Sequence, residues 1–236
     1  MTQGSARSAS PALHPSASQR VPKVVYADAL EWQASPTPHV WRKRLELSGP
    51  PESGRVTSIV RYDAGSVFPK HAHPEGEEIL VLDGVFSDEH GRYPAGTFLL
   101  NPHGSEHAPF SPDGCTLFVK LRQTPGERVR RCIDSSAQPW RPRAVAGVER
   151  IELYSEPPFP ERIHLTRVAA GVSVGPIEFP AGEEILVLEG AFDDEYGSHP
   201  KGAWLCFPAG GSHTLSTESG CTLYVKQGHL PATPSA

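Results

Sequence analysis

The stretch from Gly65 to Gly84 reads GSVFPKHAHPEGEEILVLDG and carries the most specific pattern in the chain. His71 and His73 stand two positions apart, and Glu77 follows His73 after a Pro-Glu-Gly turn. Side chains at positions i and i+2 of a β-strand leave the same face, so we expect both imidazoles to point to one side. If the turn brings the chain back, Glu77 at the start of the next strand faces the same point.

A fourth polar side chain, His107, follows a stretch at residues 96–104 that contains two glycines and a proline. Three imidazoles and one carboxylate are ligands that a mid-row divalent metal ion takes. We therefore predict one metal site formed by His71, His73, Glu77 and His107. This donor set suits zinc, iron(II), manganese(II) or nickel(II) without choosing among them. An octahedral ion would keep about two positions for water or substrate.

Several neighbouring residues are weaker candidates. Glu78 is the nearest rival to Glu77, but strand alternation places it on the opposite face. We expect His103 to be a turn residue at the rim of the pocket and His90, in the turn at residues 88–91, to be a solvated loop residue. The alternative for the histidine pair itself is two polar surface residues on an edge strand.

The sequence EEILVL occurs twice, at residues 77–82 and again 106 residues later at residues 183–188. Identities at the same spacing include Gly65, Gly84, Gly96, Pro102, Gly104, His107 and Cys115, and the match reaches back to Arg44, Glu46 and Leu47. A repeat of about 100 residues is too long for a solenoid unit and has the size of a domain. We therefore predict a gene duplication that produced two similar domains.

The second copy has lost the histidine pair. Ile177 and Phe179 stand where His71 and His73 should have counterparts, whereas Glu183 and His213 are retained. Glu178 cannot replace them, because it falls on the opposite strand face. We predict no metal there and expect Glu183 and His213 to hydrogen-bond each other, as buried charged groups need partners. The second copy is then a scaffold, with an apolar ligand pocket over Phe179 as the alternative.

The coarse structure is predicted to be all β. Runs rich in β-branched and aromatic residues, bounded by turn-forming residues, predict strands at residues 56–62, 77–86, 97–100 and 115–121. Glycine (22) and proline (25) are frequent, which favours tight turns, and no stretch has a sustained helical period. Short strands at regular spacing predict sandwiches or barrels.

Composition shifts suggest where the domains begin and end. We expect a disordered segment at residues 1–22, which is rich in Ser, Ala and Pro, and a metal-binding domain at residues 23–125. A linker is expected at residues 126–143 and a degenerate second domain at residues 144–230. Acidic residues elsewhere balance the arginines of this linker, so we expect those arginines to be solvated.

The overall charge limits the partners. A net charge of −5 argues against nucleic acid, and no apolar run approaches the length of a membrane span. The first residues lack the apolar core of a secretory signal, and none of the four cysteines forms a CxxC pair, so we expect a cytoplasmic location. The expected partners are a small-molecule ligand or substrate and a second copy of the chain in a homodimer.

The pattern resembles the cupin superfamily. Its first motif is matched at Gly65, His71, His73, Glu77 and Gly84, and its second at Gly96, Pro102, Gly104 and His107, with Ser111 replacing the final Asn. The surrounding sequence, which includes EEILVL, is similar to that of the cupins named after the ChrR anti-sigma factors. This resemblance implies two tandem double-stranded jelly-roll barrels (a bicupin), with zinc held by His, His, Glu and His in the first.

Three functions remain open. The resemblance implies a metal-binding bicupin that senses or binds a small molecule, although the chain lacks the His-x3-Cys-x2-Cys pattern through which ChrR proteins grip a sigma factor. A second hypothesis is a mononuclear non-haem iron dioxygenase for a small diketone, phenolic or thiol substrate. Phe86, Phe98 and Phe110 would be its apolar wall, and no residue stands out as an acid or base. The third is a non-catalytic scaffold that dimerises through sheet edges.

Overall fold

The structure is a computed structural model that describes residues 21–230. The segment expected to be disordered, residues 1–22, lies outside the described residues except for its last two. Across the described part of the chain there are 22 strands and two three-residue 3-10 helices, η1 (Ala27–Ala29) and η2 (Ser135–Ala137), which confirms the all-β prediction. No helix within residues 21–230 has the length and apolar character needed to cross a bilayer.

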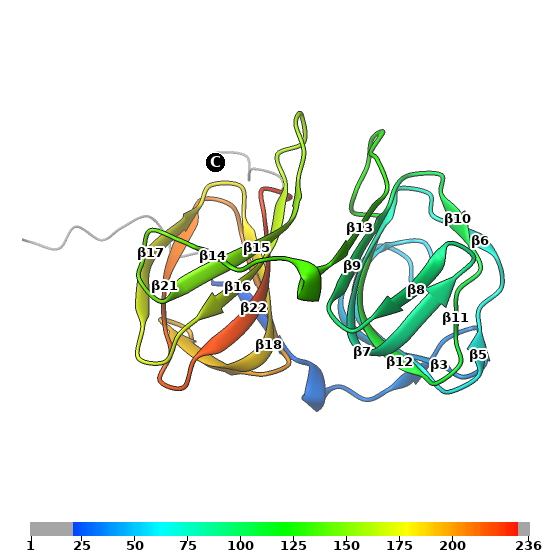
Figure 1. The fold of residues 1–236 in the computed structure, drawn as a ribbon, viewed down its shortest axis with the longest axis horizontal. Helices are drawn as coiled ribbons and strands as arrows, with labels where there is room; N and C mark the ends of the chain where they lie inside the picture. Colours follow the sequence, from blue (N-terminus) through cyan, green and yellow to red (C-terminus); the bar gives the residue numbers. More distant parts are fainter. Residues whose placement is uncertain (1–20, 231–236) are drawn as a thin grey trace, which may run out of the picture.

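The strands form two barrels that lie side by side (Figure 1). The first barrel contains β2 (Gln33–Ala34), β3 (Val40–Ser48), β4 (Arg55–Tyr62), β5 (Ser66–Val67), β6 (His71–Ala72), β7 (Glu77–Asp88), β8 (Gly91–Pro94), β9 (Thr97–Asn101), β10 (Glu106–His107), β11 (Phe110–Ser111), β12 (Cys115–Leu121) and β13 (Arg131–Asp134). The second contains β1 (Lys23–Tyr26), β14 (Arg141–Pro142), β15 (Val148–Ser155), β16 (Arg162–Val168), β17 (Ser173–Phe179), β18 (Glu183–Asp194), β19 (Gly197–Pro200), β20 (Ala203–Phe207), β21 (Gly211–Ser216) and β22 (Cys221–Gln227). The four strands predicted from sequence correspond to β4, β7, β9 and β12 and are confirmed.

Each barrel has two layers joined by one long strand. In the first, β13-β9-β7-β12-β4-β3-β2 form one layer, while the far end of β7 pairs with β8 and β11 in the other. At this passage Gly84 has a φ of +71°, and a Cβ there would lie 2.3 Å from the carbonyl oxygen of Gly114. Only glycine fits such a close backbone approach, which explains why the repeat keeps a glycine at this position.

The two barrels exchange their outer strands. β1 precedes the first barrel in sequence but pairs with β20 of the second, and β13, inside the expected linker, pairs with β9 of the first. The chain therefore crosses between the barrels twice, through the blue and the green segments of Figure 1 that carry η1 and η2. The segment that leads into the first barrel therefore supplies β1 to the second, and the segment that leads into the second supplies β13 to the first.

The strand pairing also corrects one part of the sequence repeat. In the first barrel Arg42 lies opposite Val60, and in the second Arg150 lies opposite Thr166, which is the counterpart of Val60. Arg150 therefore occupies the place of Arg42, whereas the sequence match assigned it to Arg44. The spacing of the repeat is 108 residues up to β15 and 106 from β16 onward, because the second copy has a shorter connection between these strands.

Alternating strand residues supply three separate hydrophobic clusters. Ile79 packs inside the first barrel and Ile185 inside the second, whereas their neighbours Leu80 and Leu186 belong to a cluster between the barrels. Phe118 and Tyr224, which are equivalent in the two copies, meet edge to face there at 5.1 Å between ring centroids. The interface between the barrels is therefore built as a third core.

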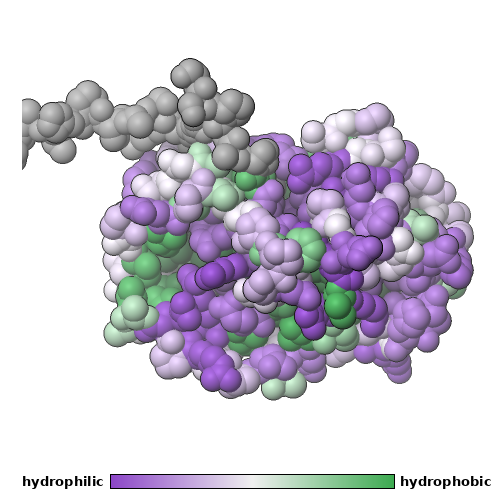
Figure 2. All heavy atoms as spheres, turned by 90° about the horizontal axis from the view of Figure 1, so that it is seen from above, coloured by the Kyte–Doolittle hydropathy of each residue, from purple (hydrophilic) through white to green (hydrophobic). Residues whose placement is uncertain are grey.

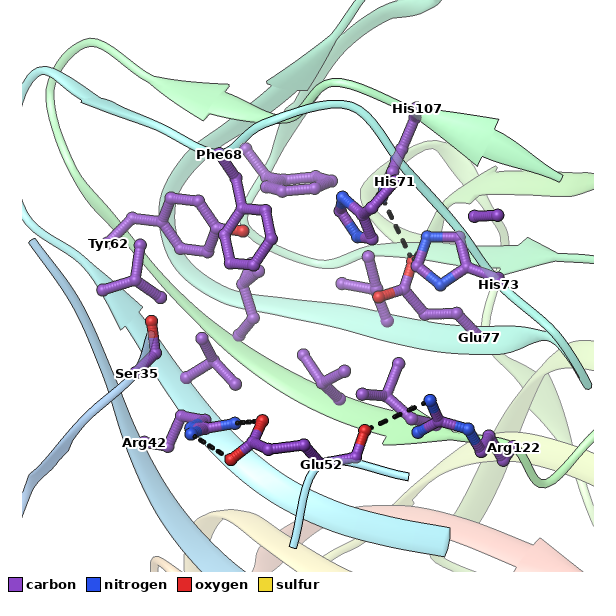
Figure 3. Close-up of a pocket in the computed structure, with 18 of the residues that line it drawn as sticks. Ser35, Arg42, Glu52, Tyr62, Phe68, His71, His73, Glu77, His107 and Arg122 are labelled. Carbon is purple, nitrogen blue, oxygen red and sulfur yellow. Dashed lines mark hydrogen bonds and ion pairs between the residues drawn. The ribbon is translucent and has the colours of Figure 1, made fainter. Parts of the chain in front are cut away.

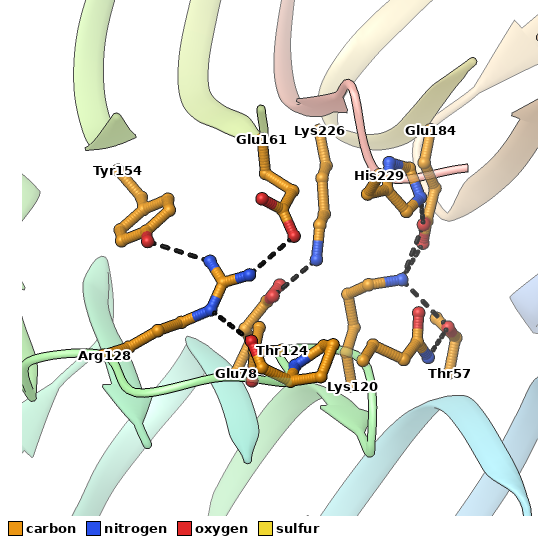
Figure 4. A network of polar contacts seen from close by, with 12 residues as sticks. Thr57, Glu78, Lys120, Thr124, Arg128, Tyr154, Glu161, Glu184, Lys226 and His229 are labelled. Carbon is orange, nitrogen blue, oxygen red and sulfur yellow. Dashed lines mark hydrogen bonds and ion pairs between the residues drawn. The ribbon is translucent and has the colours of Figure 1, made fainter. Parts of the chain in front are cut away.

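Two buried ion pairs join the barrels reciprocally (Figure 4). The Lys120 ammonium lies 2.5 Å from a carboxylate oxygen of Glu184, and the equivalent Lys226 pairs with Glu78. Burial raises the pKa of Glu184, but Lys120 and His229 outweigh it and hold that pKa below its usual range. Glu78 therefore faces the neighbouring barrel, which confirms that it lies on the face opposite to Glu77.

One linker arginine differs from expectation. Arg128 is 8% exposed and donates to the Tyr154 hydroxyl at 2.8 Å and to Glu161 at 2.7 Å (Figure 4). Its guanidinium also lies over the ring of Phe159. The prediction that it is solvated was wrong, because the expected linker runs between the barrels and buries this side chain against the second. On the face shown in Figure 2, hydrophilic residues cover much of the surface, with hydrophobic residues in patches between them.

Candidate metal centre

The structure brings all four predicted residues together inside the first barrel (Figure 3). β6 pairs with β10 so that His71 lies directly opposite His107, and the ring nitrogens of His71, His73 and His107 fall within 4.8 Å of one another. A carboxylate oxygen of Glu77 lies 3.4 Å from Nε2 of His73 and 3.6 Å from Nε2 of His107. Ligands bonded to one ion at about 2.1 Å lie up to about 4.2 Å apart, so the cluster is only slightly wider than a coordination sphere.

The turn between β6 and β7 sets the position of Glu77. His73 donates its backbone N–H to the Ser105 carbonyl at 2.9 Å, and Gly76 adopts a φ of +77°. A Cβ on Gly76 would lie 2.1 Å from the Thr124 hydroxyl oxygen. A glycine in the left-handed region is therefore needed for the chain to turn back into β7 and place Glu77 beside the histidines.

Two nitrogen atoms at the centre have no hydrogen-bond partner. Nε2 of His73 and Nε2 of His107 are both buried and make no hydrogen bond, although each lies within ion-pair distance of Glu77. His71 has its Nδ1 2.9 Å from the Pro69 carbonyl, an arrangement that leaves Nε2 free as an acceptor. Buried polar atoms are rarely left unsatisfied, so converging unpaired nitrogens fit an electrophile at their centre.

Residues behind the ligands fix their orientation. Asp88 lies 3.3 Å from Nδ1 of His107, and Asn101 donates to Glu77 at 2.9 Å. Burial raises the pKa of Asp88, but contacts with His107 and Tyr93 and the backbone N–H of His90 outweigh it and lower it to about 2. Metal-binding histidines commonly have a carboxylate on their second nitrogen in this way.

Sequence reasoning missed both of these positioning residues. Asp88 has an aspartate counterpart, Asp194, at the 106-residue spacing, so the repeat contained a signal for it. Asn101 has Phe207 as its counterpart and carried no such signal. His103 and His90 are exposed turn residues, and neither belongs to the cluster. His103 was expected at the rim of the pocket but is not among the residues that line the adjoining cavity.

Electrostatics differ among the histidines. Burial lowers the pKa of His73 and outweighs the attraction of Glu77. Burial also lowers the pKa of His107, but the Asp88 carboxylate and then Glu77 overcome this, and its pKa is raised. His73 is therefore held as a neutral imidazole, which is the form that binds a metal ion.

A cavity of about 220 Å³ adjoins the four side chains. Aromatic rings of Tyr62, Phe68 and Phe86 line it next to the histidines, and Arg42 and Arg122 lie at its far side (Figure 3). The prediction of Phe86 as a wall residue is confirmed. Phe98 and Phe110 were predicted wrongly: Phe98 faces the cluster between the barrels, and Phe110 is 36% exposed on a short edge strand.

The equivalent place in the second barrel is filled by rings. Ile177 lies opposite His213, as His71 lies opposite His107, and Phe179 packs 5.1 Å from Phe207 between ring centroids. Phe207 in turn stacks on His213 at 4.5 Å. The predicted hydrogen bond between His213 and Glu183 is confirmed at 2.9 Å. Asp194 lies 3.6 Å from the other ring nitrogen, so acidic groups flank both sides of this histidine.

Solved structures with the same architecture come from several organisms. A provisionally assigned dioxygenase of Nostoc punctiforme has a TM-score of 0.74 at 15% identity, with 91% of this chain and 85% of that chain covered. A pirin of Escherichia coli in complex with nickel(II) has a TM-score of 0.68 at 14% identity, covering 90% and 100%. Salicylate 1,2-dioxygenase of Pseudoaminobacter salicylatoxidans, solved as adducts with gentisate, has a TM-score of 0.63 at 14% identity, covering 88% and 81%. At these identities the likeness establishes the fold alone.

Sequence comparison identifies the family directly. No curated protein matches the chain by sequence. The family model of the ChrR cupin-like domain matches it twice, over residues 20–125 and 128–231. These two ranges correspond to the two copies of the repeat and cover most of the sequence. The chain therefore belongs to the ChrR cupin-like domain family and carries that domain in tandem.

Proposed function

We propose that the first barrel binds one divalent metal ion through His71, His73, Glu77 and His107, and that this site binds a small molecule as a sensor or receptor. The observation that carries the proposal is the pair of buried, unpaired Nε2 atoms of His73 and His107 beside the Glu77 carboxylate. Hydrogen bonding within the protein leaves these atoms unsatisfied, and a cation would satisfy them together.

The residues around the four ligands have positioning roles in this proposal. Asp88 holds His107 through Nδ1, the Pro69 carbonyl holds His71, and Asn101 holds Glu77. The contacts of His107 and His71 engage Nδ1 and leave Nε2 as the donor atom, whereas Asn101 bonds the same Glu77 oxygen that lies beside the histidines. Holding the ligand side chains in place before an ion arrives raises affinity by pre-organisation. A bound divalent ion would supply a Lewis acid at the base of the cavity. Zinc or iron(II) is the ion that we propose, with manganese or nickel as further candidates, since the donor set itself does not choose among them.

The cavity limits the small molecule. A space of about 220 Å³ takes a compact ligand, and the aromatic wall of Tyr62, Phe68 and Phe86 favours an apolar or aromatic body. The ligand histidines lie at the edge of this wall, so an oxygen atom on the ligand would face the ion site.

A second candidate function is that of a mononuclear non-haem iron dioxygenase for a small diketone, phenolic or thiol substrate. The observation that favours it is the aromatic wall beside a site with three imidazoles and one carboxylate. Two solved proteins of similar fold are described as dioxygenases. In this case the cavity residues would bind and orient the substrate and exclude water, and the metal would supply the reactivity.

Elemental analysis of the full chain, purified anaerobically without chelators, tests the proposal. We expect about one metal ion per chain, and its loss in the His71→Ala/His73→Ala variant. The matched control, Glu183→Gln/His213→Gln, alters the equivalent pair of the second barrel and should keep the ion. Unchanged metal content in the first variant would contradict the ligand assignment. Iron with oxygen consumption against a small substrate panel would favour the dioxygenase, whereas zinc without turnover would favour sensing.

A further inference from the structure

The interior of the second barrel differs from that of the first in two places. Its ion-site end is apolar, with Ile177 and Phe179 in place of histidines. The part bounded by β15 and β16 carries different polar residues: Thr166 stands in place of Val60, and the titratable His164 in place of Ser58.

Strand pairing shows that these polar side chains face the barrel interior. Val148 and Val168 lie opposite each other and pack in the interior cluster of the second barrel. Alternate residues share a face, so Arg150 and Thr166, which also lie opposite each other, point inward, and His164 follows on the same face. Ile163 and Leu165, by contrast, belong to the cluster between the barrels.

The inward arginine of the second barrel lacks the acidic partner that its counterpart has. In the first barrel Glu52 holds Arg42 through two hydrogen bonds of 3.1 and 3.0 Å. No carboxylate lies within ion-pair distance of Arg150, Arg143 or Arg162 anywhere in residues 21–230.

The loop that could have supplied an acid is engaged elsewhere. Residues 156–161 connect β15 to β16, as the Glu52 loop connects β3 to β4. Its two acids point toward the segment between the barrels, where Glu156 pairs with Arg131 at 3.1 Å and Glu161 with Arg128 at 2.7 Å. Arg150 is therefore left as a charged donor without a counter-ion from this loop.

Two donors on this interior face are buried without a hydrogen-bond partner. His164 is 1% exposed, and its Nε2 has no hydrogen-bond partner. Nε of Arg150 is unpaired as well, as is Nε of Arg42, but Arg42 reaches Glu52 through its other two guanidinium nitrogens. Thr166 contacts the other ring nitrogen of His164 at 2.9 Å. When the Thr166 hydroxyl donates to Nδ1, the ring proton lies on Nε2, which becomes a donor that no protein group accepts.

The charges near His164 are predominantly positive. Burial lowers its pKa, and Arg150, Arg143 and Arg162 lower it further, to about 3, so the ring is neutral near pH 7. Two acids lie nearby. Glu152 is opposite His164 in the strand register and is exposed, as Arg143 and Arg162 are. Glu183 accepts from His213 and Gln227. Burial and then Arg143 lower the pKa of Arg150, and they outweigh both acids, which raise it.

We propose that the second barrel binds a small oxyanion, a carboxylate or a phosphate, with Arg150 and His164 as its donors and Arg143 and Arg162 as flanking charges. The anion replaces the carboxylate that Glu52 provides in the first barrel. It satisfies both unpaired donors and relieves the repulsion among the arginines. The second barrel is then a separate ligand-binding domain: it binds an anion, whereas the first barrel binds a metal cation.

Isothermal titration of the full chain with inorganic phosphate, malonate and acetate, against chloride at matched ionic strength, tests this proposal. We expect saturable binding of one oxyanion per chain that chloride does not reproduce. Phosphate binding tighter than carboxylate binding would identify a phosphate site, and the reverse a carboxylate site. Arg150→Gln should weaken binding about 10- to 100-fold through loss of a charge-assisted hydrogen bond. The matched control Arg42→Gln removes the equivalent arginine of the first barrel and should leave oxyanion affinity within about twofold.

Two further measurements keep the result specific to this site. The His71→Ala/His73→Ala variant should bind the oxyanion as the wild type does, which excludes an anion held by metal in the first barrel. In a nitrogen-15 NMR titration, the Nε2 resonance of His164 should shift with saturation. Absence of saturable binding, equal binding by Arg150→Gln, or loss of binding in the double-histidine variant would each overturn the proposal.

Discussion

The two barrels carry equivalent residues on the faces that contact each other and different residues on the faces that line their interiors. Glu78 pairs with Lys226 and Glu184 with Lys120, so the two copies form equivalent ion pairs across the interface. The adjacent residues Glu77 and Glu183 lie inside the barrels. Glu77 lies beside a cluster of three histidines, whereas Glu183 contacts a single histidine. One strand thus carries a shared structural residue and a divergent site residue side by side.

This difference follows from strand alternation. Because consecutive side chains leave opposite faces, the interface and the interior can change independently after duplication. The interface residues of one copy must fit those of the other, so a change on one side disturbs both barrels. The interior of each barrel has no such reciprocal partner, and the second interior has lost the histidine pair while keeping its fold.

The largest expected effect comes from restoring the lost histidines. Ile177→His with Phe179→His places two imidazoles beside Glu183, His213 and the positioning residue Asp194, which recreates the donor set of the first barrel. We expect metal content to rise from about one to about two ions per chain by elemental analysis. Glu178→His, on the opposite strand face, should add none. A double variant that folds and still holds one ion would show that the barrels differ in more than these two residues.

Breaking one interface ion pair should give the next largest effect. Lys120→Met leaves the Glu184 carboxylate buried without its ammonium, and we expect a loss of about 3–5 kcal/mol in the free energy of unfolding. Lys226→Met should cause a similar loss if the two pairs are equivalent. Urea denaturation of both variants measures this, and a loss below about 1 kcal/mol in either would contradict the importance of the pair.

The pH dependence of the two interiors should have opposite signs. Burial lowers the pKa of His213, but Asp194 and Glu183 outweigh it and raise that pKa to about 9, above the ordinary value of 6.5. Its stabilisation is therefore complete below pH 6.5 and is lost as the pH rises through about 9, by on the order of 2–3 kcal/mol. The metal site gains affinity as its histidines lose protons, so an ion should stabilise the chain more as the pH rises from 5 to 7.

Urea midpoints of the metal-free wild type and His213→Gln, measured from pH 6 to pH 9, check the part due to the second barrel. The difference between the two proteins should shrink as the pH rises. A difference that stays constant over this range would mean that His213 is not charged in the folded protein.

Asp88→Asn should have the smallest of these effects on the first barrel. It keeps the size of the side chain but weakens its hold on His107, so we expect metal affinity to fall about 10- to 100-fold. Asp194→Asn, its counterpart in the second barrel, should leave metal affinity unchanged. Competition with a chelator of known affinity measures both, and equal losses in the two variants would contradict the assignment of Asp88.

Much of the fold and the site was predictable because both depend on local patterns. Alternating runs between glycine and proline turns define β4, β7, β9 and β12, and the spacing of His71, His73 and Glu77 requires a strand and a turn that the structure contains. The contact between Glu183 and His213 was also predictable, since two polar groups left in an apolar interior need each other.

The remainder depends on long-range packing. Nothing in the sequence of β1 or β13 indicates which sheet each strand joins, since both are short edge strands with partners in remote segments. Phe98 was assigned to the cavity by residue type alone, but its place opposite Leu80 turns it toward the other barrel. Arg128 looked solvated because charged linkers usually are, and only the docking of the barrels buries it.

Anomalous diffraction from crystals of the full chain, grown without chelators and measured at the absorption edge of the bound metal, tests the central claim most directly. We predict one peak per chain, bonded to His71, His73, Glu77 and His107, and none in the second barrel. A peak beside Glu183 and His213, or an ion bound away from the three histidines of the first barrel, would contradict the account.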